Sequence, residues 1–209
     1  MPKGSTGKKV RDRQAALVCG GAFQRLAEEL IPRIGAIDPG PSGSMSDELA
    51  GVVACATNLP FAIELYLKAL LTQLDLGVPP THDLRHLYEG IPESVRELFE
   101  SVYNMALPDE VRRLGGRVSV TVAKGPLEEP QWDDHKVSMA LPDVLSRSRD
   151  LFQSWRYAFE FSEPAHSPYQ YHKFEYGALR CAAEVLRVEV TARLQGTEEP
   201  GEGAVTAER

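Results

Sequence analysis

The segment from residue 44 to residue 76 constrains the fold more than any other, because it is apolar on most of its faces. Ser44 or Ser46 can cap its first turn, which suits the start of a helix. A helix that is apolar on most faces is buried on most sides, so this segment is expected to be the central helix of a bundle. Pro60 lies inside the segment and is expected to kink it. Its apolar residues are Leu49, Val52, Val53, Ala56, Ile63, Leu67, Leu70, Leu71 and Leu74.

Further segments on either side of the central one carry a helical spacing of apolar residues or helix-capping signals. Helices that each bury an apolar stripe must pack against one another. The sequence therefore predicts an all-α fold, an up-and-down helical bundle. The additional helices are expected at residues 11–37, 82–89, 93–105, 142–159 and 171–194.

Residues 108–142 interrupt this helical pattern. Residues 117–122 alternate between polar and apolar side chains, and residues 137–141 do so more weakly. Gly125 and Pro126 lie between the two stretches. The region therefore predicts a small β-hairpin or an ordered loop inserted between helices.

Charge and cysteine content limit the partners and the compartment. The formal net charge is -7, so any contact with nucleic acid must be local and not a property of the whole surface. Cys19, Cys55 and Cys181 are far apart in apolar helical sequence, which indicates buried, reduced thiols. No stretch approaches the apolar length of a membrane span, and the basic residues before Cys19 indicate the start of a helix and not an export signal. We therefore expect a cytoplasmic protein with no membrane partner.

The composition also divides the chain into one domain and two ends. Residues 1–9 are polar and are expected to form a flexible N-terminus. Residues 10–195 are expected to form the helical domain, with its insertion at 108–142. Residues 196–209 are rich in Gly and Glu and are expected to form a disordered tail.

Three stretches of the chain match a known pattern in the same order. Residues 58–71 contain Ala-Ile-Glu-Leu-x-Leu-Lys, residues 81–88 contain His-Asp-Leu-x-x-Leu, and residues 152–160 contain Arg-Tyr-x-x-Glu. Together, over about 110 residues with an insertion, they resemble HEPN domains (higher eukaryotes and prokaryotes nucleotide-binding domains). The resemblance implies a helical bundle that commonly dimerises.

Many HEPN proteins are metal-independent endoribonucleases in bacterial toxin–antitoxin and anti-phage systems. The resemblance therefore implies a homodimer that binds or cleaves RNA in bacterial stress or anti-phage defence. Catalytic members carry an Arg followed, after four to six residues, by His, and no histidine here has that spacing. Arg156 is the natural candidate Arg, but Phe161, Ser162 and Glu163 stand where His would be. The alternative is a non-catalytic HEPN-type scaffold that dimerises and holds a nucleotide or a partner protein.

Glu64 and Lys68 are the first candidate binding residues, because they interrupt the apolar central segment. One interpretation is a helix-surface ion pair worth about 0.3–0.5 kcal/mol. The other is a polar stripe, continued by Thr57 and Thr72, that lines a cleft or an interface. Asn58, at the start of the first matching stretch, is included as a further candidate binding residue.

The second candidate cluster is Trp155-Arg156-Tyr157. The Arg side chain could hold a phosphate while a base stacks on an aromatic ring, or the aromatic residues could anchor the core with Arg156 paired to an acid. His82 either caps the short helix or moves a proton near neutral pH. His172 follows a loop whose aromatic and basic residues could contact nucleotides.

The proposed chemistry needs neither a metal nor a cofactor. The ribose 2′-hydroxyl would attack the adjacent phosphate, with His82 or His172 as general base and Arg156 stabilising the developing charge. His166 and His172 have no cysteine or carboxylate at metal-ligand spacing, and the sequence has no glycine-rich phosphate loop. The hypothesis requires the segments around Glu64 and Arg156 to meet in space.

Overall fold

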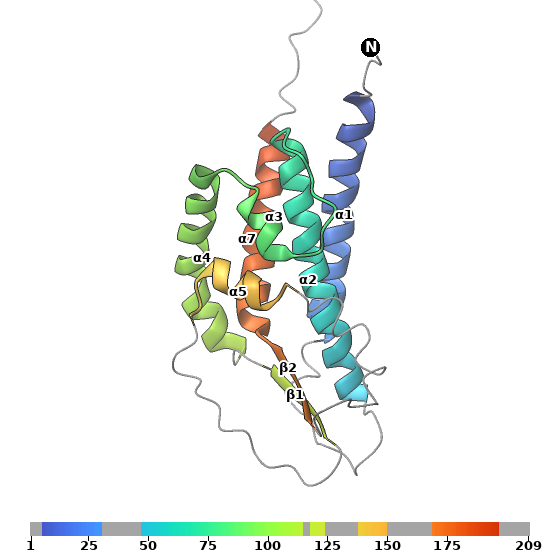
Figure 1. Cartoon of the computed structure of the whole chain (residues 1–209), viewed down its shortest axis with the longest axis vertical. Helices are drawn as coiled ribbons and strands as arrows, with labels where there is room; N and C mark the ends of the chain where they lie inside the picture. Colours follow the sequence, from blue (N-terminus) through green and yellow to red (C-terminus); the bar gives the residue numbers. More distant parts are fainter. Residues whose placement is uncertain (1–5, 31–46, 115–117, 124–137, 150–168, 197–209) are drawn as a thin grey trace, which may run out of the picture.

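Four long helices form an up-and-down bundle in the computed structural model, which describes residues 6–30, 47–114, 118–123, 138–149 and 169–196 (Figure 1). Figure 1 shows two of them running in one direction, α1 and α4, and two in the other, α2 and α7. The predicted helical bundle is therefore confirmed. The bounds are α1 Thr6–Leu30, α2 Asp47–Gln73, α4 Glu93–Leu114 and α7 Tyr176–Gly196.

Helices α2 and α7 pack against each other at the centre of the bundle. Helix α1 packs mainly on α2, and α4 packs on α7, so the two outer helices flank the central pair (Figure 1). The short helix α3 (Leu84–Glu89) contacts α2, and the short helix α5 (Leu141–Arg147) contacts α3 and α7. The most apolar segment of the sequence thus has the central position that its composition predicts.

The centre of the bundle is built largely from the apolar side chains of α2. Full burial of a Leu or Ile side chain contributes roughly 1.5–3 kcal/mol, so this helix supplies a large share of the core's stabilisation. Its fully buried apolar residues are Val52, Cys55, Ala56, Leu59, Ala62, Ile63, Tyr66, Leu67, Ala69 and Leu70.

Part of α2, the 23-residue segment Gly51–Gln73, is long and apolar enough to cross a membrane by length and composition. The prediction that no stretch approaches that length was therefore wrong. In the structure 61% of the segment's most apolar window is buried inside the molecule. A core helix meets the same criterion as a membrane span, because both must be apolar on most faces.

Helices α1 and α2 are in close contact at Gly20. A Cβ atom at this position would lie 2.6 Å from Cε1 of Tyr66. The Tyr66 side chain is fully buried, and its hydroxyl donates a 2.8 Å hydrogen bond to Oε1 of Gln24 on α1. Glycine at position 20 therefore makes room for the Tyr66 ring between the two helices.

A two-stranded sheet lies at one end of the bundle (Figure 1). Strand β1 (Val118–Ala123) pairs antiparallel with β2 (Tyr169–Phe174), with Val118 opposite Phe174 and Ala123 opposite Tyr169. The first predicted strand, 117–122, is therefore present, but the predicted hairpin partner at 137–141 was wrong. Residues 138–140 have no regular structure and lead into α5, where Pro142 stands in the first turn. Proline has no N–H to give to a strand and suits a helix start.

Helix boundaries differ from the predicted ones at several points. Helix α1 already begins at Thr6, inside the N-terminus predicted to be flexible, and α4 continues through Pro108 to Leu114, inside the predicted insertion. The last helix begins at Tyr176 and not at 171, because residues 169–174 form β2. Helix α5 ends at Arg147, where the amide of Ser148 bonds back to Val144, although a helix through residue 159 was predicted. Residues 150–168 and the predicted tail from 197 onward lie outside the described residues.

The cysteines are only partly as predicted. Cys55 and Cys181 are buried, and burial raises the pKa of the Cys55 thiol to about 12 and that of Cys181 to about 11. Cys19 is exposed, so its predicted burial was wrong. It lies on the outward face of α1, next to Val18, which is also exposed. Apolar residues on a helix that packs on one side only are not all buried.

Candidate functional site

The centre of the candidate site is Glu64, a carboxylate that is buried in α2 with 2% of its surface exposed. The Lys68 ammonium, one turn later, donates to its Oε1 at 2.6 Å. Nδ1 of His82 lies 3.0 Å from each of the two carboxylate oxygens. A buried carboxylate needs such partners, because an unpaired charge inside a protein costs several kcal/mol.

His82 is brought to Glu64 by the turn that precedes α3. The Asp83 side chain accepts a 3.0 Å hydrogen bond from the His86 amide and caps α3, and the Thr81 hydroxyl accepts one from the Asp83 amide. Asp83 is thus the helix cap, and His82 is not, which leaves its ring to face α2. Leu84 and Leu87 are buried and hold α3 against the bundle. Local turn chemistry and apolar burial together fix the position of the histidine.

The Glu64 carboxylate fixes the orientation of the His82 ring. A carboxylate in its ionised form only accepts hydrogen bonds, so it favours the tautomer of His82 in which Nδ1 carries the proton and donates to Glu64. The carboxylate is buried, whereas half of the histidine side chain, 50%, is exposed. A surface histidine oriented by a buried carboxylate can exchange protons with a ligand, as a general acid or base does.

Lys68 sets the charge of this site. Its positive charge cancels the negative charge of Glu64, and its side chain is 24% exposed. The site is therefore neutral when His82 is neutral and positive when His82 is protonated. An anionic ligand meets no net repulsion here, although the whole chain carries a net charge of -7.

The rest of the predicted polar stripe on α2 has a structural explanation. The Thr57 hydroxyl donates to the Val53 carbonyl and the Thr72 hydroxyl to the Lys68 carbonyl, both at 2.8 Å. Such bonds to the preceding turn satisfy the hydroxyl within its own helix. Asn58 is half-buried on α2, and within the described residues no hydrogen bond joins it to Glu64.

The structure leaves the second predicted cluster undetermined. Trp155, Arg156 and Tyr157 lie outside the described residues. His172 lies in β2 opposite Val120, at the sheet end of the bundle, and was predicted in a helix. The structure therefore brings Glu64, Lys68 and His82 together, while the predicted meeting with Arg156 stays a prediction.

In the part of the chain that the structure describes, no group of three or more His, Cys, Asp or Glu side chains could hold a metal ion.

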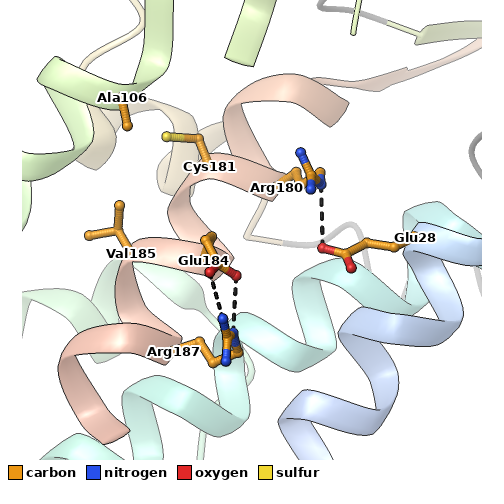
Figure 2. Close-up of a pocket in the computed structure, with 7 residues that line it drawn as sticks. All are labelled: Glu28, Ala106, Arg180, Cys181, Glu184, Val185 and Arg187. Carbon is orange, nitrogen blue, oxygen red and sulfur yellow. Dashed lines mark hydrogen bonds and ion pairs between the residues drawn. The ribbon is translucent and has the colours of Figure 1, made fainter. Parts of the chain in front are cut away.

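A second charged region, which sequence reasoning missed, is a pocket where α1, α4 and α7 meet (Figure 2). Its volume is about 410 Å³. Figure 2 shows Glu28 of α1 facing Arg180, and Glu184 facing Arg187, with Ala106, Cys181 and Val185 on the apolar side. The pocket thus has one charged side and one apolar side.

Beneath the charged side of the pocket lies a buried amide. Gln24, 3% exposed, donates through Nε2 to Glu28 at 3.1 Å and to Glu184 at 3.0 Å, and accepts from Tyr66. Arg187 donates to Glu184 through both Nε and Nη2. The hydrogen bonds from Arg187, with that from Gln24, hold the pKa of Glu184 below its ordinary value. Glu184 is therefore ionised at neutral pH and fixed in place.

One part of this second region could have been found from the sequence. Arg180, Glu184 and Arg187 follow one another at spacings of four and three, which places them on one face of α7. Their partner Glu28 precedes Arg180 by 152 residues, and nothing in the sequence links the two. The sequence could have indicated a charged stripe on α7, but not the pocket.

No protein-family model matches the chain, and comparisons with the curated proteins and with the solved structures find no match. The HEPN resemblance stays a prediction, so the geometry of the described residues must carry the functional argument.

Proposed function

We propose that the protein is a HEPN-like RNA-binding protein of bacterial stress or anti-phage defence, and that it cleaves RNA without a metal at the Glu64 site. The observation that supports this proposal is the exposed His82 ring held by the buried Glu64 carboxylate, with Lys68 beside it. An oriented imidazole and an adjacent ammonium are the groups that transfer of a ribose phosphodiester requires.

The proposed reaction uses the RNA's own 2′-hydroxyl as nucleophile. His82 takes the proton of that hydroxyl, and the 2′-oxygen forms a bond to the adjacent phosphorus. The bond from phosphorus to the 5′-oxygen breaks, and the leaving 5′-oxygen takes the proton back from the imidazolium. The products are a 2′,3′-cyclic phosphate and a 5′-hydroxyl. Lys68 stabilises the charge on the phosphorane, and Glu64 is a positioning residue that acts through His82.

The experiment is cleavage of a labelled RNA in EDTA by the purified full chain. His82→Ala should lower the rate at least roughly a hundredfold, the usual contribution of a general base. His86→Ala is the matched control, because His86 is an exposed histidine in α3, four residues after His82, with no part in the Glu64 cluster. An RNA with one 2′-deoxyribose at the cleavage position should resist cutting there. Cleavage that survives His82→Ala would overturn the proposal.

Two further variants assign the supporting roles. Glu64→Gln should change the pH profile of cleavage as well as its rate, because it removes the charge that orients His82. Arg156→Ala tests the charge-stabilising role that the sequence assigns to Arg156. A rate equal to that of the parent would remove Arg156 from the mechanism and leave Lys68 as the cation.

The second candidate function is a non-catalytic HEPN-type scaffold, and a separate observation favours it. Leu98, Val102 and Met105 form an exposed apolar stripe on α4, with 43%, 37% and 71% of their surfaces accessible. A second copy of the chain would bury this stripe in a homodimer. Sedimentation of the parent and of Met105→Glu tests this: a dimer that the substitution dissociates, in a chain that does not cleave RNA in EDTA, supports the scaffold, and monomers in both cases exclude it.

A further inference from the structure

The turn that carries His82 leads into α3, and α3 is too short to hold its position alone. Helix α3 has six residues and α5 has seven, whereas isolated helices shorter than about 12 residues are marginal in water. Helix α3 packs mainly on α2 and α5, and α5 packs mainly on α3 and α7 (Figure 1). Whatever fixes α5 on α7 therefore also acts on α3.

Arg147, in the last turn of α5, joins this helix to Glu175, the residue immediately before α7. Its Nε lies 3.2 Å from each carboxylate oxygen of Glu175, and its Nη2 donates to Oε2 at 2.8 Å. Nη2 also donates to the Ser138 carbonyl at 2.7 Å, in the segment that leads into α5. One guanidinium thus ties the chain on both sides of α5 to the start of α7.

The contact between Arg147 and Glu175 gives α5 a directional constraint that its other contacts do not. Leu141, Val144 and Leu145 are buried, but apolar burial is not directional. The start of α5 has no capping side chain. Glu175 is only 8% exposed, and a guanidinium that meets both oxygens of a carboxylate has a fixed geometry.

The side of α5 that faces α3 completes the connection to His82. Nη1 of Arg85 on α3 lies 4.0 Å from Oδ1 of Asp143 on α5. Both side chains are partly exposed, so this ion pair contributes little, and the packing of α5 on α3 provides most of the coupling. We propose that Arg147 and Glu175 are positioning residues for His82: their pair holds α5 on α7, and α5 holds α3 so that the His82 ring meets Glu64. The catalytic consequence rests on the proposed function, whereas the position of the ring does not.

The first test is ¹⁵N NMR of the histidine rings in the purified full chain, in alkaline buffer where the rings are neutral. The signals of His82 are assigned by their absence in His82→Ala. In the parent they should be those of the tautomer with the proton on Nδ1, the nitrogen that faces Glu64. Arg147→Gln should move them toward the mixture of tautomers of free histidine. Signals of His82 that stay in place in this variant would overturn the proposal.

Arg187→Gln is the matched control for Arg147→Gln. Arg187 also donates through Nε and Nη2 to a carboxylate, but its partner Glu184 lies in the pocket formed with α1 and α4. Its loss should leave the His82 signals unchanged, and an equal movement in both variants would contradict the assigned role. Arg147→Lys keeps the charge beside Glu175 and should restore part of the parent signals. This variant also keeps the proposal testable if Arg147→Gln does not fold.

The second test is the steady-state kinetics of RNA cleavage in EDTA. Arg147→Gln should lower kcat by roughly tenfold to a hundredfold, because a displaced base slows the chemical step. KM should stay unchanged, because Arg147 is assigned no contact with RNA. A changed KM with an unchanged kcat would make Arg147 a binding residue and overturn the positioning role. A parent chain that cleaves no RNA would contradict the proposed function, and the NMR result would still decide whether Arg147 positions His82.

Discussion

The Glu64 site and the α1–α4–α7 pocket are both built from carboxylates and cations, but the group that is buried in the core differs between them. At the Glu64 site the carboxylate is in the core, and its partners Lys68 and His82 extend toward the surface. In the pocket the buried group is the neutral amide of Gln24, and the charged groups around it are partly exposed.

This difference predicts where a substitution is costly. A buried charged group that loses its partners loses hydrogen bonds that water cannot replace. The same is true when the partner of a buried group loses its charge. Exposed ion pairs exchange readily with water and contribute about 0–1 kcal/mol each. The Glu64 site should therefore respond to loss of one charge more strongly than the pocket does. The pocket should respond most to changes in the packing beneath it.

The largest effect is expected from Gly20→Val, which changes that packing. The new side chain would overlap the Tyr66 ring, because even a Cβ atom would lie 2.6 Å from it. We expect a loss of about 2 kcal/mol in the free energy of unfolding, measured in urea. NMR should show the Gln24 and α7 resonances moving, since Tyr66 bonds to Gln24, while those of His82 stay in place. Equal movement at His82 would mean that the two regions are one network.

Gly51→Ala is the control for this substitution. Gly51 is also buried in a helix, but a Cβ atom there would meet nothing within 4 Å. Alanine is the better helix former, so this variant should gain roughly 0.5–1 kcal/mol. A loss in both variants would show that glycine matters in these helices for a reason other than the Tyr66 contact.

The next largest effect is expected from Glu64→Gln. The amide keeps the size of the carboxylate but removes the negative charge that pairs with Lys68 and places an N–H donor where His82 now meets an acceptor, so we expect a loss of about 1–2 kcal/mol. Urea unfolding at neutral pH measures it. Lys68 and His82 can both reach water, which keeps the loss below that of a fully buried pair. A loss no larger than that of Glu184→Gln would break the contrast between the two regions.

The smallest effect is expected from Glu184→Gln, and it depends on pH. Because the pKa of Glu184 is lowered in the folded state, its ionised form stabilises the fold above the ordinary value of 4.5. That contribution is lost as the pH falls below 4.5 through the folded-state pKa. The side chain is 47% exposed, so we expect less than about 1 kcal/mol at neutral pH. Unfolding free energies of parent and variant should converge as the pH falls below 4.5, and a constant difference would exclude the ion pair as the cause.

Part of the arrangement around Glu64 can be predicted from the sequence because its geometry is local. Glu64 and Lys68 share one face of one helix, and the turn that carries His82 follows a few residues after that helix ends. The helix pattern and the turn residues near 81–83 therefore predict most of the arrangement. What the sequence could not predict is that the Glu64 side chain is buried while His82 is exposed, because this depends on how α3 packs.

The pocket and the sheet could not be predicted because their parts meet only after folding. Glu28 and Arg180 come from opposite ends of the chain, and β1 and β2 lie on either side of α5. The alternation at 117–122 identified one strand, but it carried no information about its partner. The segment 169–174, Tyr-Gln-Tyr-His-Lys-Phe, also alternates. The helical pattern that follows it led to the prediction that the last helix begins at residue 171, five residues before α7 begins.

The pairing of β1 with β2 has a consequence for the time order of folding during translation. About 50 residues separate the paired strands along the chain. At roughly 5–20 residues per second, β1 is synthesised several seconds before its partner. Strand β2 leads directly into α7 in the chain, so the bundle can gain α7, its last helix, only after β2 has been made. A translational pause in the codons between the two strands would lengthen the time for which the nascent chain carries an unpaired strand.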